Sequence, residues 1–164
     1  MADAQAGGAA NPDPNHDPAL PTGSWASSEA TRRSMQGNRS RDTRPEVALR
    51  SAVHALGLRY RVAARPLRDV RRTADLVFRP RRIAVFVDGC FWHGCPDHFV
   101  TPRTNADYWA AKILRNQTRD AETDAVLATE GWTVVRVWEH EDPRRGAERV
   151  REAIVRSRSG ASRG

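Results

Sequence analysis

One stretch of fourteen residues constrains the fold more than any other part of the chain: FVDGCFWHGCPDHF, at positions 86–99. It holds both cysteines of the chain and two of its five histidines, interleaved with aspartates, glycines and aromatic residues. Cysteine, histidine and aspartate are side chains that bind metals and exchange protons. The stretch is therefore interpreted as an active site, as a turn held by a metal ion, or as both.

Four side chains have the type and spacing of zinc ligands: Cys90, Cys95, His98 and His140. The first three follow the pattern C-x4-C-x2-H, which is close to the spacing with which a loop surrounds a tetrahedral zinc ion. The fourth stands just beyond an apolar strand at 132–139, and it joins the others if that strand lies parallel to the strand at 83–89. Four protein ligands leave no place for a substrate water, so this zinc would be structural. His93 competes for one place, and unlinked cysteines with surface histidines are the alternative.

The pattern of apolar and turn residues predicts a mixed sheet flanked by helices, an α/β fold. The capping sequence TRPE at 43–46 begins the first helix, and its apolar side is expected to carry Val47, Ala48, Ala52 and Leu56. The apolar run at 83–89 indicates a strand covered on both faces, and Asn105 is expected to cap a long helix. The predicted order is helix, three strands, helix, strand, helix, at 43–56, 58–64, 74–78, 83–89, 106–129, 132–139 and 143–155.

Composition divides the chain into four segments. Residues 1–25 are rich in Ala, Gly, Pro and Asp without apolar periodicity, so a disordered N-terminal tail is expected. Residues 26–44 are polar and basic, and they are expected to form an arm or short helix that contacts DNA. One domain of ordinary size is expected at 45–157, followed by a flexible C-terminal tail at 158–164.

The charge balance favours a polyanionic partner. The formal net charge is +7, and Lys112 is the only lysine, so the basic residues are almost all arginine. The arginine side chain donates paired hydrogen bonds to phosphates and to guanine edges, which points to nucleic acid as the partner. A GC-rich genome, however, also produces arginine-rich chains. No stretch approaches the ~20 apolar residues that cross a bilayer. A cytoplasmic protein is expected, in which nearby cysteines are metal ligands or catalytic thiols rather than a disulfide.

Two aspartates, Asp75 and Asp88, stand on strands that are expected to form a hairpin. Carboxylates brought together at a sheet end form a site for Mg²⁺, which orients water and stabilises a departing phosphate oxygen. An acid, a strand, a turn, a strand and a second acid form the skeleton of many nucleases, although aspartates at strand ends more often cap turns. Cys90 stands where many nucleases have lysine, so another group must activate water. His93 is the nearest candidate, because imidazole titrates near neutral pH.

Aromatic residues accompany these groups: Phe91 and Trp92 in the same loop, and Tyr108 and Trp109 downstream. Adjacent rings point in different directions, so at least one ring is expected at the surface. An exposed ring beside a basic surface stacks on a base or wedges between base pairs. The alternative is that these rings belong to the core.

Five segments, taken in order, resemble the very short patch repair (Vsr) DNA mismatch endonuclease family: RSMQGNRSRDTRPE, ADLVF, VFVDGCFWHGCPDHF, TNADYWAAKILRN and GWTVVRVWEHE. They extend from about Arg33 to His140, and GCFWHGC is the most specific of them. The resemblance implies a restriction-endonuclease-like fold of the PD-(D/E)xK type. It also implies a Mg²⁺-dependent nick on the 5′ side of the thymine in a T:G mismatch, the lesion left when 5-methylcytosine deaminates.

The resemblance implies roles for individual residues as well. Asp75 would be the central magnesium ligand, beside the main-chain carbonyl of Val87, with His93 as the base for the attacking water. Three further acids match positions around two Mg²⁺ ions: Glu46, Asp88 and Asp120. One structural Zn²⁺ would be held by Cys90, Cys95, His98 and His140. Four side chains would insert beside the mismatch: Phe91, Trp92, Trp109 and Met35.

Several alternatives stay open at the level of the sequence. Some family members have histidine at the position of Asp88, so direct metal binding by this aspartate is undecided. Glu46 also has a simple role as the capping-box partner of Thr43. Two other functions remain: a restriction-type or other repair nuclease of the same fold without T:G preference, and a zinc-stabilised DNA-binding module without catalysis. Expected partners are duplex DNA with a T:G mismatch and mismatch-repair proteins, with the enzyme a monomer associated with the nucleoid.

Overall fold

The computed structural model describes residues 41–161, with side chains described up to residue 158. The tail predicted at 1–25, most of the arm predicted at 26–44 and Met35 lie outside the described residues. The helices are α2 (Arg44–Ala55), α3 (Ala106–Thr129) and α4 (Pro143–Ala161), with a short 3-10 helix η1 (Arg79–Arg81). The strands are β1 (Arg61–Ala64), β2 (Ala74–Phe78), β3 (Ile83–Asp88) and β4 (Thr133–Trp138). Of the helices described, none has the length and apolar character that crossing a membrane requires.

The four strands form one mixed sheet in the order β1-β2-β3-β4. β2 pairs antiparallel with both β1 and β3, whereas β3 and β4 run parallel. The parallel pair is in register from Ile83 opposite Thr133 to Asp88 opposite Trp138. Parallel strands need a long crossover, and α3 supplies it. The C-terminal ends of β3 and β4 therefore meet at one edge of the sheet.

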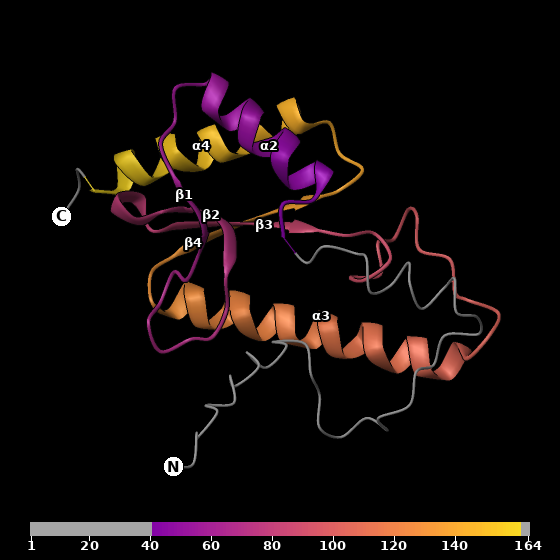
Figure 1. The fold of residues 1–164 in the computed structure, drawn as a ribbon. Coiled ribbons are helices and arrows are strands. Elements are labelled where there is room, and N and C mark those ends of the chain that lie inside the picture. Colours follow the sequence, from indigo (N-terminus) through magenta and orange to yellow (C-terminus); the bar gives the residue numbers. More distant parts are fainter. Residues whose placement is uncertain (1–40, 162–164) are drawn as a thin grey trace, which may run out of the picture.

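Helices cover both faces of the sheet, with α2 and α4 packed together on one face and α3 on the other (Figure 1). Because successive side chains of a strand point to opposite faces, β3 contributes to a core on each side. The core under α2 and α4 includes Leu49, Val53, Leu76, Val85 and Val150. The smaller core under α3 is formed by Ala74, Val77, Ala84 and Leu127. The predicted mixed sheet flanked by helices and the predicted burial of β3 on both faces are confirmed.

α2 begins as predicted but buries a different face. Leu49 and Val53, one turn apart, enter the core, whereas Val47 and Leu56 are 46% and 38% exposed. The predicted apolar side was therefore wrong for Val47 and Leu56, whereas Ala52 packs against the core as expected. Positions i and i+4 share one face of a helix. The face of α2 that meets the sheet is centred on Leu49 and Val53, whose buried side chains are larger than those of the alanines.

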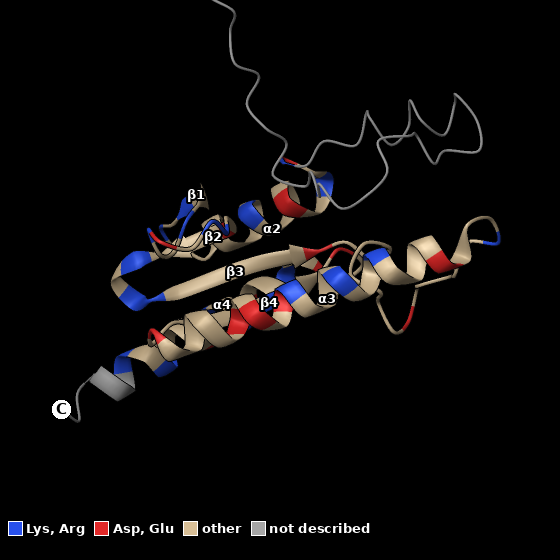
Figure 2. Ribbon diagram, turned by 90° about the horizontal axis from the view of Figure 1, so that it is seen from below, with Lys and Arg blue, Asp and Glu red and all other residues tan. Residues whose placement is uncertain are grey.

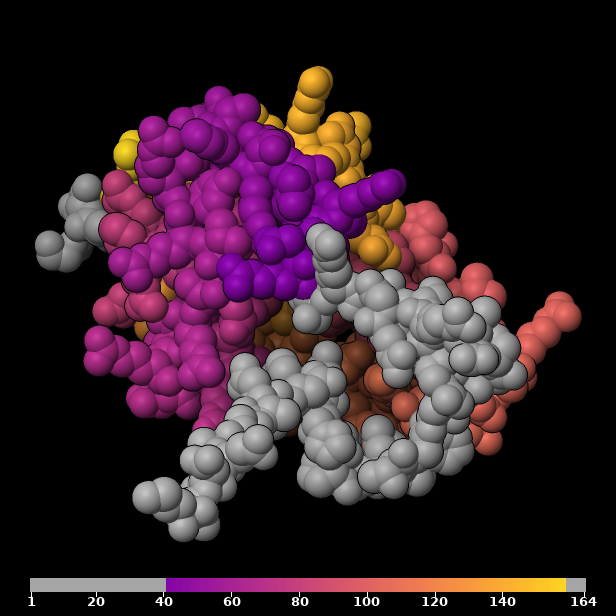
Figure 3. All heavy atoms as spheres, in the orientation of Figure 1, coloured from indigo at the N-terminus to yellow at the C-terminus, as the bar shows by residue number. Residues whose placement is uncertain are grey.

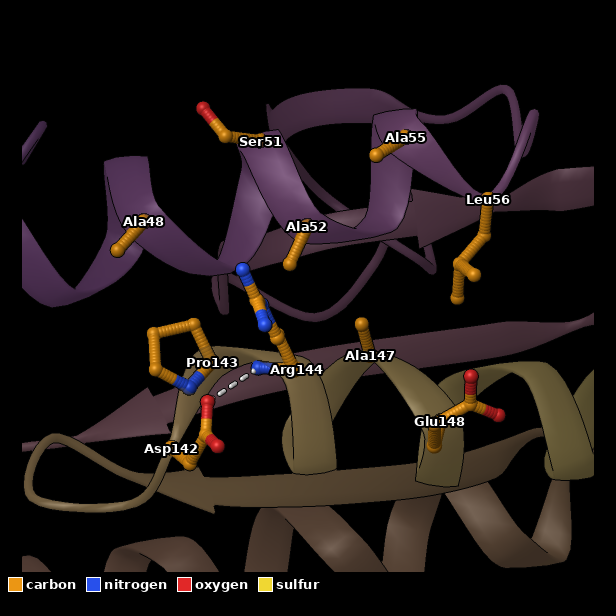
Figure 4. A pocket seen from close by; sticks show the side chains of 10 residues that line it. All are labelled: Ala48, Ser51, Ala52, Ala55, Leu56, Asp142, Pro143, Arg144, Ala147 and Glu148. Carbon is orange, nitrogen blue, oxygen red and sulfur yellow. Dashed lines mark hydrogen bonds between the residues drawn. The ribbon is translucent and has the colours of Figure 1, made fainter.

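Small side chains line the facing sides of α2 and α4, and they leave a groove of about 510 Å³ between the two helices (Figure 4). Ala48, Ala52 and Ala55 line it from α2, opposite Pro143 and Ala147 of α4. The groove lies on the face of the sheet away from α3, and its lining includes none of the site residues predicted from the sequence. α2 and the hairpin of β1 and β2 form the adjoining surface, coloured indigo to magenta in Figure 3.

The remaining boundaries follow the prediction with three differences. β1 begins later than the strand predicted at 58–64, and α4 continues past residue 155 to Ala161. Asn105 precedes α3 as expected, but its φ is 56° and its side chain makes no capping hydrogen bond. The cap predicted there was wrong. A capping residue has extended backbone, whereas asparagine also tolerates the left-handed conformation that this turn requires.

Candidate functional site

The zinc ligands predicted from the sequence lie just past the ends of β3 and β4. The last register pair joins Asp88 to Trp138, and Cys90 and His140 each lie two residues beyond it. Hydrogen bonds continue the pairing: the N–H of Glu139 donates to the carbonyl of Asp88 at 2.9 Å. The N–H of Cys90 then donates to Glu139 Oε1 at 2.6 Å. The parallel neighbours that the zinc hypothesis required are therefore present.

Four donor atoms converge, and each lies within 4.8 Å of the others; they belong to Cys90, Cys95, His98 and His140. Cys90 Sγ lies 3.1 Å from His140 Nδ1, and Cys95 Sγ lies 3.7 Å from the Nδ1 atoms of His98 and His140. In a tetrahedral site with Zn–S bonds of about 2.3 Å and Zn–N bonds of about 2.0 Å, sulfur and nitrogen lie about 3.6 Å apart. The donor set fits a structural zinc, and both cysteines are free thiols.

The electrostatics of the two cysteines also suit a cation. Burial raises the pKa of Cys90 to about 11, and the neighbouring Cys95 contributes to the rise. Two adjacent buried thiols ionise together only when a positive charge compensates them, and a bound zinc ion provides that charge. His93 belongs to a different group of side chains, described below, and does not compete for this position.

The loop that follows β3 is seated on α3. Asn116 and Gln117 donate side-chain hydrogen bonds to the carbonyls of Trp92 and His93, at 2.8 and 3.1 Å. Gly94 has a φ of +61°, and a Cβ at this position would lie only 2.7 Å from the Gln117 amide nitrogen. Glycine alone accepts both the conformation and the close approach. The loop is therefore fixed from one side by α3 and from the other by the converging zinc donors.

A second group of converging side chains consists of Asp88, His93 and Asp120. His93 Nδ1 lies 2.5 Å from Asp120 Oδ2, which reaches out from α3, and 3.8 Å from Asp88 Oδ1 at the end of β3. Figure 2 shows acidic ribbon where β3 ends beside α3. An ionised carboxylate only accepts hydrogen bonds, so Nδ1 carries the proton. In the neutral ring, Nε2 is then the nitrogen that can accept a proton.

The members of this group shift one another's pKa. Burial alone would lower the pKa of His93, but the hydrogen bond with Asp120 and the charge of Asp88 raise it overall. Burial likewise opposes ionisation of Asp120, yet the bond with His93 lowers the pKa of this carboxyl. Burial raises the pKa of Asp88, which is 5% exposed, against the opposing charge of Arg136. The raised pKa of His93 beside ionised Asp120 makes its ring a stronger base than a free imidazole, so His93 is suited to take up a proton.

Arg136 joins this group, although it was not singled out from the sequence. It lies in the middle of β4, opposite Phe86 in the parallel pair, and its guanidinium carbon is 5.0 Å from the centre of the Phe86 ring. It makes ion pairs with three aspartates: Asp88, Asp120 and Asp124. The signal that would have revealed it is an arginine inside the apolar run WTVVRVW, because a charge in a covered strand requires partners.

Asp75 lies where β2 and β3 separate. Their antiparallel pairing stops at Leu76, and the N–H of Val87 donates to Asp75 Oδ2 at 2.7 Å. Burial raises the pKa of Asp75 to about 6; the bond from Val87 opposes the rise, and the charges of Glu46 and Asp88 add to it. A half-buried carboxylate beside two other acids is stabilised in its ionised form by a divalent cation. This end of β2 therefore fits a cation site.

Glu46 takes part in the start of α2. Its carboxylate accepts hydrogen bonds of 2.9 Å from Thr43 Oγ1, from the N–H of Asp42 and from Arg50 Nη2. These bonds reach back over the first turn, but Thr43 makes no side-chain capping hydrogen bond, so the reciprocal capping box predicted at 43–46 is not formed. Glu46 is also close enough to Asp75 to raise the pKa of that carboxyl. It thus borders the acidic group while holding the helix start.

The rings of Phe91, Trp92 and Trp109 form one cluster. Phe91 lies 5.1 Å from Trp92 and 5.2 Å from Trp109, and the two tryptophan rings are 6.0 Å apart. Lys112 Nζ lies 5.3 Å from the centre of the Trp92 ring. Trp109 is only 8% exposed, whereas Phe91 and Trp92 are half-buried. The core interpretation therefore holds for Trp109, while Phe91 and Trp92 present part of their rings at the surface.

The predicted metal-binding and catalytic side chains that the structure describes fall into three neighbouring sets, beside the aromatic cluster. The zinc donors form one set, Asp88 with His93 and Asp120 a second, and Asp75 with Glu46 a third. β3 connects them, because Val87 bonds to Asp75, Asp88 joins the second set, and Cys90 begins the first. The segment GCFWHGC therefore contributes side chains to two groups of different chemistry.

Comparison with known proteins identifies the class. The sequence model of the family described as DNA mismatch endonuclease Vsr matches residues 26–98. The type II nicking enzyme V.NaeI of Lentzea aerocolonigenes is 51% identical over 112 residues, covering 67% of this chain and 68% of that protein. The type II nicking enzyme V.NmeDIP of Neisseria meningitidis serogroup C is 40% identical, covering 82% and 92%. The DNA mismatch endonuclease Vsr of Escherichia coli K12 is 36% identical, covering 68% and 70%.

These relationships define the chain as a DNA endonuclease, a hydrolase of the phosphodiester backbone. More particularly, it belongs to the Vsr family of DNA mismatch endonucleases. The α/β fold predicted from the sequence, a mixed sheet between flanking helices, is the fold observed. The catalytic domain of the homing endonuclease I-Bth0305I superposes with a TM-score of 0.46 and 13% identity, covering 71% of this chain and 98% of that one.

Proposed function

We propose that the chain nicks duplex DNA on the 5′ side of the thymine in T:G mismatches that arise from deamination of 5-methylcytosine, and so initiates very short patch repair. Membership of a family described as mismatch endonucleases supports the substrate. The names of the Lentzea and Neisseria relatives, which are nicking enzymes, support cleavage of a single strand. One nick requires one active site, so the proposed functional unit is a monomer.

The observation that carries the proposal is the loop after β3. Within a few residues it joins the Asp88 end of the strand, the His93 ring bound to Asp120, and the partly exposed rings of Phe91 and Trp92. An enzyme that hydrolyses DNA at a distorted base pair needs a hydrolytic centre next to groups that enter the duplex. This loop provides both on one rigid support.

Mg²⁺, as two ions, is the proposed cofactor. Asp75 and the main-chain carbonyl of Val87 would hold it, with Glu46 nearby; when bound, magnesium neutralises charge on the scissile phosphate and the leaving oxygen. Asp88 is proposed to act from outside the coordination sphere. Both of its oxygens accept hydrogen bonds from Arg136 Nη1, at 2.8 and 3.0 Å, so its charge is already paired with the guanidinium.

His93 is proposed to take a proton from the attacking water. The water oxygen forms a bond to phosphorus while one phosphorus–oxygen ester bond breaks, and the proton passes to Nε2 of the ring. Asp120 accepts the hydrogen bond from Nδ1 throughout, so it holds the productive tautomer and stabilises the imidazolium that forms. Positioning and electrostatics of this kind provide most of the rate enhancement in phosphodiester hydrolysis.

Specificity is proposed to come from insertion of rings beside the mismatch. Phe91 and Trp92 would enter the duplex, and Trp109 and Met35 would assist, the Trp109 ring leaving its cluster to do so. A wobble pair costs less to unstack than a matched pair, so obligatory insertion favours mismatched DNA. One structural zinc, held by the Cys2His2 set, is proposed to keep the loop that carries these rings in place.

The remaining proposals concern the division of the chain into segments, its location in the cell and its protein partners. Residues 26–44 are proposed to contact DNA, since the family match begins at residue 26. The endonuclease domain is proposed to comprise 45–157, between an N-terminal tail at 1–25 and a C-terminal tail at 158–164. The proposed location is the cytoplasm, at the nucleoid, where mismatch-repair proteins are proposed partners.

The test is a panel of nicking assays in Mg²⁺ on T:G, other mismatched and matched duplexes, with randomised flanking sequence. We expect a nick 5′ of the mismatched thymine about 5- to 30-fold faster than on matched DNA, given a difference of about 1–2 kcal/mol in distortion energy. Equal rates on all duplexes would reject the mismatch assignment and support a restriction-type nuclease. DNA binding without any cleavage would support the non-catalytic module. Cleavage at the normal rate by His93→Ala would reject the proposed base.

A further inference from the structure

The guanidinium of Arg136 uses all three of its nitrogens on neighbouring acids. Nη1 donates to both carboxylate oxygens of Asp88, at 2.8 and 3.0 Å. Nε donates to Asp124 Oδ2 at 3.0 Å, and Nη2 donates to Asp124 Oδ1 at 3.0 Å, which makes a bidentate pair. Nη2 also lies 3.4 Å from both the carbonyl and Oδ1 of Asp120. One side chain of β4 thus links the end of β3 to two successive turns of α3.

The two carboxylates that contact His93 are both held by Arg136. Asp120 turns Oδ1 toward Arg136 and Oδ2 toward His93 Nδ1, so it bridges the guanidinium and the ring. Asp88 Oδ1 accepts from Arg136 and also lies 3.8 Å from His93 Nδ1. Movement of Arg136 would therefore disturb both contacts of the ring at once.

Arg136 itself has little freedom to move. Its backbone is paired in the parallel ladder opposite Phe86, its guanidinium lies over the Phe86 ring, and its side chain is largely buried. Its charge is also needed, because Asp88 is buried and two more aspartates lie alongside. Removing one partner of such a group leaves like charges close together in a poorly solvated place, and they then separate or take up protons.

We propose that Arg136 is a positioning residue for hydrolysis: it fixes Asp88 and Asp120 and orients His93 through them. The inference rests on the proposed role of His93 as the base. The planar guanidinium serves three acceptors in fixed directions, whereas the ammonium of lysine is a point charge that cannot hold all three. The identity of the residue, and not only its charge, therefore matters.

The experiment measures nicking by the full chain in saturating Mg²⁺, on the duplex that the wild type cleaves best, over a range of DNA concentrations that gives both kcat and KM. Arg136→Met should lower the rate about 10- to 100-fold, the usual effect of losing a group that orients a catalytic side chain, with KM for DNA within about threefold. Arg136→Lys should recover only part of the rate. Arg151→Met removes an arginine that pairs with Glu148 on the surface of α4, and it should nick at the wild-type rate.

A double variant separates positioning from a purely structural role. If Arg136 acts through Asp120 and His93, Arg136→Met combined with Asp120→Asn should be no slower than the slower single variant, because both changes disturb one path. Rate losses that multiply would overturn the inference. Asp124→Asn keeps the Arg136 bonds to Asp88 and should lose only a few-fold in rate, which keeps the test available if Arg136→Met folds poorly.

The outcomes also distinguish this inference from the proposed function. If Arg136→Met nicks at the wild-type rate while His93→Ala is slow, the positioning role of Arg136 is rejected and the role of His93 as base is retained. If His93→Ala nicks at the wild-type rate, both roles are rejected. A wild type that nicks matched and mismatched DNA equally rejects T:G specificity alone, and the rate comparison among the Arg136 variants still decides the positioning role.

Discussion

At the scale of single residues, Asp75 is where stability and activity conflict. A carboxyl whose folded pKa lies above its ordinary value holds its proton more tightly in the folded chain, so stability decreases as the pH rises toward that folded value. Burial and the acids nearby raise the pKa of Asp75 to about 6. Near neutral pH the ionised side chain, which a divalent cation needs, therefore destabilises the chain when no cation is bound.

Asp75→Asn should stabilise the chain and abolish nicking. Asparagine keeps an oxygen for the Val87 N–H and carries no charge, so the melting temperature should exceed that of the wild type at pH 7 and above. The difference should shrink as the pH falls below about 6, where the wild-type carboxyl is protonated. Thermal denaturation without added divalent cation measures this, alongside a nicking rate at least about 100-fold lower. A lower melting temperature at pH 7 would contradict the argument.

Gly94 and Gly57 provide a matched pair of substitutions. Both have positive φ, +61° and +73°, but a Cβ at Gly94 would lie 2.7 Å from Gln117 Nε2 and 2.9 Å from Ile113 Cγ2, whereas nothing lies within 4 Å at Gly57. Gly57→Ala should cost about 1 kcal/mol of backbone strain. Gly94→Ala adds crowding and should cost about 2–4 kcal/mol, with slower nicking because His93 is displaced. Denaturant titration measures both, and equal losses would show that α3 does not constrain the loop.

At the scale of elements, the parallel pair of β3 and β4 determines where the chemistry lies. Their register brings Cys90 beside His140 and Arg136 beside Asp88, and α3 places Asp120 against the loop between them. No single element contains a complete site. Each donor group becomes functional only when two or three elements are packed in the correct register.

Loss of the proposed zinc site should therefore abolish nicking, even though its proposed role is structural. His140→Ala removes a donor that binds between both cysteines, whereas His54→Ala changes an exposed histidine on α2 and serves as the control. We expect metal analysis to find about one zinc per chain in the control and none in His140→Ala, with a large loss of nicking only in the latter. Unchanged zinc content in His140→Ala would exclude this ligand.

The partly exposed tryptophan of the loop should set the mismatch preference. Trp92→Ala removes the ring that packs on Phe91 and lies beneath Lys112, whereas Trp92→Phe keeps an aromatic ring at the same place. Stacking of one base on a ring contributes about 1–3 kcal/mol, so Trp92→Ala should lose about tenfold or more in the ratio of T:G to matched nicking. Trp92→Phe should keep most of that ratio. An unchanged ratio in the alanine variant would reject insertion by this ring.

Elements with a strong local signal were predictable from sequence, and contacts between elements were not. α3 was predicted at its observed bounds because a long amphipathic run ends at Gly131, and the Cys2His2 set followed from spacing plus one condition on strand direction. The prediction of the buried face of α2 was wrong for Val47 and Leu56, because these residues are apolar yet lie on the flank of the helix. Arg136 was missed because its three partners come from β3 and α3, and nothing local to β4 indicates them.

At the scale of the whole molecule, the formal net charge of +7 comes almost entirely from arginines, while the acids of the candidate site converge where β3 ends beside α3 (Figure 2). Positive charge attracts the DNA backbone without regard to sequence, whereas the proposed ring insertion discriminates among base pairs. We therefore expect affinity and specificity to have separate physical origins.

Salt should accordingly weaken binding while leaving discrimination nearly intact. If about six phosphates are neutralised, affinity for duplex DNA should fall about 10³-fold between 50 and 200 mM salt. The ratio of affinities for T:G and matched duplexes should change far less, because ring insertion releases no counterions. Fluorescence anisotropy over a salt series measures both quantities. If the ratio of T:G to matched affinity falls with salt as steeply as the affinity itself, specificity depends on charge and not on ring insertion.

The two-residue offset of Cys90 and His140 from the last pair of β3 and β4 also bears on biosynthesis. A metal ion bound there cross-links positions fifty residues apart in the sequence and encloses all of α3. By the relation used for disulfides, closing a loop of that length restricts the unfolded chain by about 4 kcal/mol. The ligand that closes the loop is also the last to be translated. A nascent chain that has produced His93 but not β4 lacks Arg136 and His140, so the proposed site can be completed only after β4 has been made.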